Sequence, residues 1–312
     1  MQANKNRLNS KTHRAFLRRC IPLYIFLLPA FIIVILFQYL PMFSNYMAFL
    51  DYDFNNGWFG MASPFIGLKN FEFVFEASFW KMAGRTVLYS FTLMLFSFPL
   101  SLVLALLINE VRHETFKKVL QTLTYIPHFV SWVTVAGLFY LFLSTDRSGL
   151  VNNILELFGL KRYPYMQDAN YFLPFLVISK TWKEIGWGTI IYLASLAAID
   201  PQMYEAATVD GAGRWKQCIY ITLPCLLPTT SVLLIFELGK MFTSNFDQIF
   251  NMQNTLIRSK TDTLNVHTYY RGVVYQQYAY AAAVGLFQGV FSLILVLTTN
   301  YVTKKLSDTG VF

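Results

Sequence analysis

The sequence Glu205-Ala206-Ala207-Thr208-Val209-Asp210-Gly211 is followed, after nine further residues, by Ile221-Thr222-Leu223-Pro224. Written as a pattern it is E-A-A-x3-G-x9-I-x-L-P. This short polar segment separates two strongly apolar stretches, Tyr171–Ala198 and Leu226–Phe246, each long enough to be one helix. The pattern therefore indicates a compact, polar connection between two long helices, and the remaining sequence shows where those helices lie.

The composition is that of a membrane protein. Hydrophobic residues make up 55% of the 312 residues and charged residues only 13%, against about 25% charged in soluble proteins. A helix needs roughly 20 apolar residues to cross a bilayer, and only a helix satisfies its own backbone polar groups there. Six stretches qualify, in whole or in part: Ile21–Asn45, Arg85–Ile108, Val119–Leu143, Tyr171–Ala198, Leu226–Phe246 and Ala279–Val302. We predict an all-α polytopic membrane protein with six transmembrane helices.

The distribution of Lys and Arg predicts the orientation. The first 20 residues carry six basic side chains and no acidic one. If that end lies in the cytoplasm, the inner segments hold thirteen basic residues and the longer outer segments, 46–84, 144–170 and 248–278, hold eight. Both termini are therefore expected in the cytoplasm. The net charge of +8 follows from this topology and does not indicate a nucleic-acid partner.

The predicted organisation follows from these spans. It consists of a cytoplasmic basic N-terminus (1–20), a first transmembrane helix (21–45), an extracytoplasmic segment (46–84), a five-helix core (85–302) that contains the cytoplasmic loop 199–224, and a cytoplasmic tail (303–312). The first apolar run lacks a small-x-small cleavage site after it, so it is expected to be a span and not a signal peptide.

The polar loop resembles the coupling loop of a permease subunit from an ATP-binding-cassette (ABC) importer. In that family the loop docks into a cleft of a separate ATPase subunit. The resemblance implies that Glu205, Ala206, Ala207 and Gly211 are docking residues, with Asp210, Ala212 and Ile221 in support. Pro201 can start a first short helix, and Gly211 and Gly213 are expected to supply the backbone freedom for a turn to a second.

The resemblance extends over most of the chain and implies the ABC type I importer permease fold. Stretches similar to the permeases for oligosaccharides and polysaccharide fragments are Tyr125–Trp132, Trp182–Gly188 and Phe246–Phe250. The family implies several partners: a second homologous permease, two ATPase subunits, an extracytoplasmic solute-binding protein, a saccharide substrate and a lipid bilayer. It also implies the bacterial cytoplasmic (inner) membrane as the location.

The sequence indicates no catalytic or metal site of its own. A phosphate-binding loop needs G-x4-G-K-[ST], but Gly239-Lys240 is followed by Met241. We therefore expect no cofactor in this chain, with ATP and Mg on the partner ATPase. The three cysteines are unpaired in sequence and accompany no cluster of His or carboxylate residues, so they are expected to be structural.

Charged and polar residues in or next to the predicted spans, with two nearby tryptophans, are the candidates for a solute pathway, because ionisable residues are costly in lipid and usually functional. The candidates are Trp182, Lys183, Glu184, Trp187, Asn245, Asp247 and Gln248. An indole can cover the apolar face of a pyranose, and carboxylates or amides can bond its hydroxyls. The alternative is internal pairing or contact with a partner permease. Lys180 and Glu184, or Glu237 and Lys240, have the spacing to meet on one helix face. His128 is expected to be a packing or wall residue.

Other functions remain open. An ABC permease for a non-sugar solute would share the same loop. A secondary transporter would need inverted repeats or broken helices in matched positions, and the sequence contains no evident repeat. A membrane enzyme would need a clustered catalytic constellation, whereas the four histidines are scattered. The intramembrane charges are balanced, so neutral and acidic saccharides are both possible.

Overall fold

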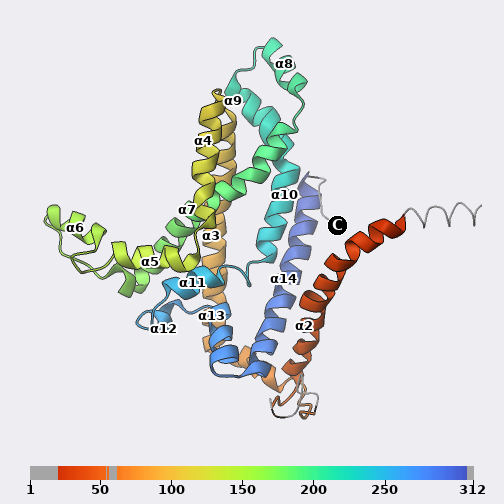
Figure 1. Ribbon diagram of the computed structural model, residues 1–312, viewed down its shortest axis with the longest axis vertical. Helices are drawn as coiled ribbons and strands as arrows, with labels where there is room; N and C mark the ends of the chain where they lie inside the picture. Colours follow the sequence, from red (N-terminus) through yellow and green to blue (C-terminus); the bar gives the residue numbers. More distant parts are fainter. Residues whose placement is uncertain (1–19, 54, 56–61, 308–312) are drawn as a thin grey trace, which may run out of the picture. The chain divides into compact units, whose positions relative to one another are not determined.

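The computed structural model describes residues 20–307, apart from 54 and 56–61, and these residues are almost entirely helical (Figure 1). Nearly all of the predicted cytoplasmic N-terminus, and the last five residues of the predicted tail, lie outside the described residues. The chain divides into two compact units. One comprises Met1–Phe71 with Gln277–Ala283, and the other comprises Glu72–Gln276 with Val284–Phe312.

Long helices alternate with short connecting ones. In chain order the named elements are the π-helix η1 (Ile35–Tyr39), α2 (Leu40–Met42), the 3₁₀ helices η2 (Phe43–Phe49) and η5 (Lys69–Phe75), α3 (Ala77–Asn109), α4 (Glu114–Tyr125), the 3₁₀ helix η6 (Ile126–Phe129), α5 (Trp132–Phe142), α6 (Leu150–Leu157), the 3₁₀ helix η7 (Tyr165–Gln167), α7 (Ala169–Ala197), α8 (Pro201–Val209), α9 (Arg214–Gln217), the π-helix η8 (Cys218–Thr222), α10 (Leu223–Gly239), α11 (Phe246–Met252), α12 (Arg258–Thr261), α13 (Leu264–Tyr269), the π-helix η9 (Tyr270–Val274) and α14 (Tyr278–Ser307).

The first unit consists mainly of one apolar helical stretch, Cys20–Phe49. None of the residues in its most apolar window is buried, as expected for a helix whose solvent is lipid. Beyond it, Leu50 and Phe65 form an antiparallel bridge. The amide of Asn70 donates hydrogen bonds to the carbonyls of Ala48 (3.1 Å) and Leu50 (2.8 Å), which fixes the loop that follows the helix.

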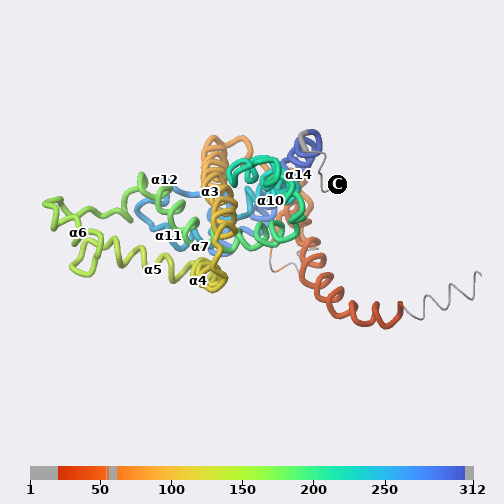
Figure 2. The backbone as a smooth tube through the Cα atoms, turned by 90° about the horizontal axis from the view of Figure 1, so that it is seen from above, coloured from red at the N-terminus to blue at the C-terminus, as the bar shows by residue number. Residues whose placement is uncertain are grey.

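The second unit is built around the packing of α3 against α7 (Figure 1). α6 lies far from α3 in both views, beyond α5, which packs against α11 (Figures 1 and 2). The main core lies where α3, α5, α7 and α11–α13 meet, and its buried residues are Tyr89, Leu93, Ala136, Phe172, Leu176, Ile249, Met252, Ile257 and Val266. A second core joins α3, α7 and α10 nearer the loop 199–224, through Ala105, Tyr192, Leu196 and Leu226.

Four helical stretches of the described residues are long and apolar enough to cross a membrane: Cys20–Phe49, Ala77–Asn109, Arg214–Gly239 and Tyr278–Lys305. The number is five if a bent pair, Glu114–Phe129 with Trp132–Phe142, is one span. α7 has the length of a span, but Lys180, Lys183 and Glu184 make it less apolar than the others. The described chain is thus a multi-span helical protein with four or five spans by length and composition.

Three boundaries differ from the sequence prediction. The stretch Val119–Leu143 is not one straight helix, because the chain bends by 92° between Phe129 and Trp132. The bend follows Pro127 in η6, and the Ser131 hydroxyl then caps a new helix by accepting a hydrogen bond from the Thr134 amide.

The second and fifth helices also differ in extent. α3 begins at Ala77, so it includes eight residues that hydropathy assigned to the outer segment. The fifth span ends at Gly239 and not at Phe246. The polar residues between α10 and α11 form a turn, which brings Asn245 against α7.

Candidate functional site

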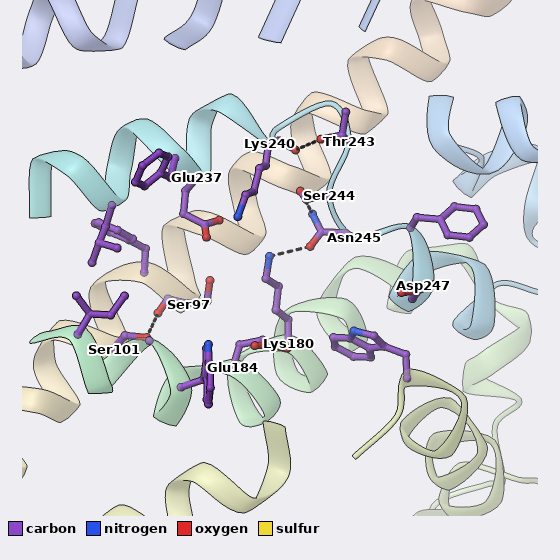
Figure 3. A pocket seen from close by; sticks show the side chains of 18 of the residues that line it. Ser97, Ser101, Lys180, Glu184, Glu237, Lys240, Thr243, Ser244, Asn245 and Asp247 are labelled. Carbon is purple, nitrogen blue, oxygen red and sulfur yellow. Dashed lines mark hydrogen bonds between the residues drawn. The ribbon is translucent and has the colours of Figure 1, made fainter. Parts of the chain in front are cut away.

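A cavity of about 590 Å³ lies between α3, α7, the end of α10 and the turn into α11 (Figure 3). Five charged side chains line it: Lys180, Glu184, Glu237, Lys240 and Asp247. Its aromatic lining consists of Phe98, Trp132, Trp187, Tyr192, Phe236 and Phe246. Such a concentration of charge on apolar helices is costly in a membrane unless the charges face a polar route or a partner. All five charged side chains border this cavity.

A hydrogen bond crosses one side of the cavity. The ammonium of Lys180 on α7 donates to Oδ1 of Asn245 at 2.7 Å (Figure 3). Asn245 has a φ of +66°, a left-handed conformation that asparagine tolerates better than most residues. Its side-chain amide donates to the hydroxyl of Ser244 at 2.9 Å. The α10–α11 turn is therefore tied to the middle of α7.

Glu237 and Lys240, at the end of α10, project into the same cavity (Figure 3). The sequence allowed these two residues to pair on one helix face, but among the described residues they form no ion pair with each other. Lys180 likewise forms none with Glu184 in the described chain, since its ammonium bonds Asn245. The alternative of internal pairing along one helix is therefore wrong for both pairs.

Glu184 is paired instead with His128 of η6 and with its own neighbour on α7, Lys183. One carboxylate oxygen lies 2.8 Å from Nδ1 of His128, and the other lies 3.4 Å from the ammonium of Lys183. Lys183 is buried and donates to the backbone carbonyl of His128 at 2.5 Å. The three residues form a cluster that joins α7 to η6. His128 does not itself line the cavity, and it packs against α7 with a specific carboxylate partner.

The candidate pathway residues divide into two groups. Glu184, Trp187, Asn245 and Asp247 line the cavity. Trp182, Lys183 and Gln248 do not line it.

The residues outside the cavity occupy three different environments. Gln248 is fully buried, and its amide donates to the Leu176 carbonyl (2.7 Å) and the Ser179 hydroxyl (2.9 Å), which docks α11 on α7. Lys183 is buried under His128, whereas Trp182 is exposed.

Several lining residues were absent from the sequence-based candidates, namely Ser97, Ser101, Trp132, Lys180, Glu237 and Lys240. Lys180, Glu237 and Lys240 had a visible signal, since each is a charge in an apolar stretch, but their spacing favoured internal pairs. The serine hydroxyls of α3 had no such signal in the sequence, because serine is common within helices, where its hydroxyl donates a hydrogen bond to a carbonyl of the preceding turn. Ser101, for example, donates to the Ser97 carbonyl at 2.9 Å.

The loop 199–224 folds into the predicted short helix α8 and a second helical segment, α9, at one end of the unit (Figure 1). α9 is not the separate short helix that was predicted, because the helical stretch is continuous from Arg214 to Gly239. Pro201 is the first residue of α8. The Asp200 carboxylate caps this helix by accepting a hydrogen bond from the backbone N–H of Gln202 at 2.9 Å. Gly211 has a φ of +76°, so it supplies the turn. Gly213 does not, because its φ of −70° is open to any residue, and its role in the turn was wrongly assigned.

Side-chain contacts hold the loop as one piece. The amide of Gln217 donates to the hydroxyl of Thr208 at 2.9 Å and to the carbonyl of Ala212 at 3.1 Å. The hydroxyls of Tyr204 and Thr222 lie 2.9 Å apart, which links α8 to η8.

The loop is also fastened to α3 and to the helices of the cavity. Arg214 forms an exposed ion pair with Glu110, at the end of α3, at 3.1 Å. α7 and α10 both adjoin this loop, and both line the cavity.

The outer surface of the loop is open. Glu205, Ala206, Asp210 and Gly211 are exposed, and Ala207, Ala212 and Ile221 are half-buried. Val209 keeps 87% of its surface exposed, which is unusual for an apolar residue of a loop this well ordered by hydrogen bonds. A small, partly apolar surface of this kind suits a protein partner.

The chain is similar to a known protein family and to several known proteins. The sequence profile of the family described as binding-protein-dependent transport system inner membrane component matches residues 97–308. Protein LplB of Bacillus subtilis (strain 168) is 38% identical over 96% of this chain and 93% of its own length. The polygalacturonan/rhamnogalacturonan transport system permease protein YteP of the same organism is 40% identical over 93% and 90%.

A solved structure is also similar. It is the crystal structure of a bacterial ABC transporter involved in the import of the acidic polysaccharide alginate. One of its chains matches with a TM-score of 0.84 and 36% identity, over 94% of this chain and 98% of that one. A second structure of an alginate ABC transporter, in complex with an alginate pentasaccharide-bound periplasmic protein, matches equally well, with a TM-score of 0.84.

Proposed function

Because the chain belongs to the family of binding-protein-dependent transport system inner membrane components, we propose that it is one permease subunit of an ATP-driven importer for oligosaccharides or polysaccharide fragments. One observation carries this proposal. The cavity is charged and aromatic, and two of the helices that line it, α7 and α10, are joined by the loop that carries the E-A-A motif. The same pair of helices would therefore contact the solute and connect, through the loop, to the ATPase.

The proposed membrane arrangement has six spans. Four spans are the apolar stretches, the fifth is the bent pair α4–η6–α5, and the sixth is α7. The low apolarity of α7 does not argue against a span, because Lys180 and Glu184 face the cavity and Lys183 is paired internally. The excess of basic residues supports cytoplasmic termini and a cytoplasmic loop 199–224 in the bacterial inner membrane.

The energy source in this proposal is a separate subunit. Two ATPase subunits with ATP and Mg bound would serve the importer, one of them docking on the exposed residues Glu205, Ala206 and Gly211 and on the half-buried Ala207. A second, homologous permease would complete the pathway, because the family resemblance implies such a partner. A binding protein outside the membrane would deliver the solute, as the family description implies.

An acidic saccharide is the favoured substrate class. The names of two relatives refer to polygalacturonan and to alginate, which is an acidic polysaccharide. In this chain the carboxylate of Glu184 is already paired with His128 and Lys183. Within the described part of the chain, the ammonium of Lys180 bonds only a neutral amide, so it can exchange that partner for a substrate carboxylate.

Uptake tests the proposal directly. Cells that carry the chain with its partner subunits should accumulate a labelled trisaccharide of galacturonic acid, and deletion of the chain or depletion of ATP should abolish the accumulation. Uptake that survives ATP depletion would contradict ATP-driven import and support a secondary transporter. Uptake of another solute class, with no saccharide taken up, would support an ABC permease for a non-sugar solute.

A further inference from the structure

Two glycines hold the backbone of α7 in place on either side of Trp187. A Cβ atom on Gly186 would lie 1.9 Å from the backbone carbonyl oxygen of Thr124 on α4. A Cβ atom on Gly188 would lie 2.6 Å from the hydroxyl of Ser101 on α3. Both neighbours are therefore in direct contact with the α7 backbone. The position from which the Trp187 side chain leaves the helix is set by α3 and α4 together.

The indole of Trp187 is itself stacked. Its ring lies parallel to the imidazole of His128, with the centroids 4.2 Å apart and the planes inclined by 5°. Phe129 adds an edge contact at 6.2 Å. Trp187 nevertheless remains 47% exposed and borders the cavity. A large flat apolar surface is thus presented at the cavity wall with its other side supported.

The supporting imidazole is fixed in turn. Nδ1 of His128 is bonded to Glu184 at 2.8 Å, and its backbone carbonyl accepts a hydrogen bond from Lys183. The ammonium of Lys183 also lies 5.4 Å from the ring centre of Trp132, the other tryptophan that lines the cavity. A single ionic cluster therefore contacts the support of one indole, Trp187, and the ring of the other, Trp132.

We propose that Trp187 is the surface on which a pyranose ring of the transported saccharide stacks, and that His128 is the positioning residue that holds the indole for it. The proposal rests on the proposed function of saccharide import. The C–H face of a pyranose is apolar and matches a rigid indole, while its hydroxyl and carboxylate groups are left free for polar partners. Those partners are available in the same cavity at Lys180 and Asn245.

A rigid platform improves binding because the ordering of the side chain is completed before the solute arrives. This explains why a carboxylate and a buried lysine are committed to His128 and not left free for the solute. Trp182 offers the contrast. It is on the same helix and is also 47% exposed, but it does not line the cavity. The two tryptophans differ in their surroundings and not in their exposure.

The test measures saccharide binding to the assembled permease–ATPase complex in lipid nanodiscs, without the binding protein. The probes are a trisaccharide of galacturonic acid and neutral maltotriose. Trp187→Ala should raise the dissociation constant of whichever probe binds by about tenfold, which corresponds to about 1.4 kcal/mol. Trp187→Phe, which keeps a smaller ring, should give an intermediate value. Trp182→Ala is the matched control and should leave the constant unchanged.

The role of His128 is tested by a double-mutant cycle. His128→Ala should weaken binding less than Trp187→Ala does, and His128→Phe should restore most of the loss because it keeps a flat ring against the indole. The double variant should bind no more weakly than Trp187→Ala alone, because the support has no effect once the platform is absent. Additive losses would contradict the positioning role.

The outcomes separate this inference from the function on which it rests. If the wild-type complex binds a probe and Trp187→Ala binds it equally well, or if Trp182→Ala has the same effect as Trp187→Ala, the platform is wrong and saccharide import stands. If the wild-type complex binds neither these probes nor any other saccharide, the saccharide function fails and the platform fails with it. Yield of the assembled complex shows that each variant folds.

Discussion

Lys180 and Asn245 are separated by 65 residues in the chain, yet the ammonium of one donates a 2.7 Å hydrogen bond to the side-chain oxygen of the other. The bond closes one side of the cavity between α7 and the α10–α11 turn. A cation at this position that bonds a neutral amide is available to an anionic solute, and this availability leads to the first prediction.

Lys180→Met should reduce uptake of the galacturonic acid trisaccharide strongly and uptake of maltotriose only weakly. A hydrogen bond to a charged group is worth about 1.5–3 kcal/mol, so roughly a tenfold or larger loss is expected for the acidic probe. The measurement is the initial uptake rate of each labelled trisaccharide. Lys161→Met, which removes an exposed lysine before α7, is the control. Equal losses for the two probes would contradict a carboxylate-binding role.

Gly211→Ala should weaken association with the ATPase, whereas Gly213→Ala should leave it unchanged. Gly211 has a φ of +76°, and an L-residue pays about 1–2 kcal/mol in that region. Gly213 has a φ of −70°, and an added Cβ would meet nothing within 4 Å. Co-purification of the ATPase with each tagged variant measures the effect. Glu205→Lys should abolish association by reversing the charge of an exposed residue; retained ATPase in that variant would place the docking surface elsewhere.

Gly186→Ala should destabilise the chain because α7 and α4 would have to separate. The added Cβ would lie 1.9 Å from the Thr124 carbonyl oxygen, and overpacking of this kind costs about 1–3 kcal/mol. Gly84→Ala in α3 is the matched control, since nothing lies within 4 Å of its added Cβ. That change should be neutral or stabilise by about 0.5–1 kcal/mol through helix propensity. Thermal unfolding of the purified variants in detergent compares them; a Tm for Gly186→Ala at or above that of the wild type would show that the two helices are not in contact there.

Tyr163→Phe should raise the pKa of Asp168. The Tyr163 hydroxyl donates to the Asp168 carboxylate at 2.5 Å, and this bond, followed by that from the Asn170 amide, lowers the pKa of the carboxyl group. The same bond raises the pKa of Tyr163. Folding lowers the Asp168 pKa, so the ionised Asp168 carboxylate that caps α7 stabilises the folded state at pH values above the ordinary aspartate pKa. This stabilisation is lost as the pH falls through the lowered pKa. Infrared titration of ¹³C-labelled aspartate measures the shift; Tyr165→Phe is the control.

The main features of the fold follow from local sequence. Apolar stretches of about 20 residues can satisfy their backbone in lipid only as helices, so hydropathy identifies their approximate positions. The loop 199–224 was predicted as two short helices with a turn, because Pro201 and Gly211 have backbone preferences that do not depend on distant contacts. Gly213 shows the limit of this reasoning, since a glycine does not always adopt a conformation that requires one.

The bend in the third predicted span could not be placed from hydropathy. Both arms are apolar, and a proline such as Pro127 is tolerated within some membrane helices. Pro99, Pro174 and Pro228 lie inside the continuous helices α3, α7 and α10 in the same chain. The 92° break after η6 therefore depends on the new cap at Ser131 and on the packing of α5 against α11.

The cavity was predicted only in part, because side chains in it come from helices whose relative rotation is set by packing. Gln248 and Asn245 are three residues apart and similar in chemistry, yet one is buried against α7 and the other faces the cavity. Trp182 and Trp187 look equivalent in sequence, and the fold brings only the second against His128. Spacing along α7 would allow Lys180 and Glu184 to pair with each other. In the structure Lys180 bonds Asn245 of the α10–α11 turn, and Glu184 pairs with His128 of η6.

By itself, therefore, the sequence determined the helical membrane class, the polar loop between α7 and α10 and the family resemblance, because these depend on residue type and spacing along a single segment. Only the tertiary structure decided which charges meet, which tryptophan is supported and where the cavity lies. The physical reason is that a membrane helix is apolar on nearly every face, so its hydropathy carries little information about rotation. Close contacts such as Gly186 with Thr124 set that rotation.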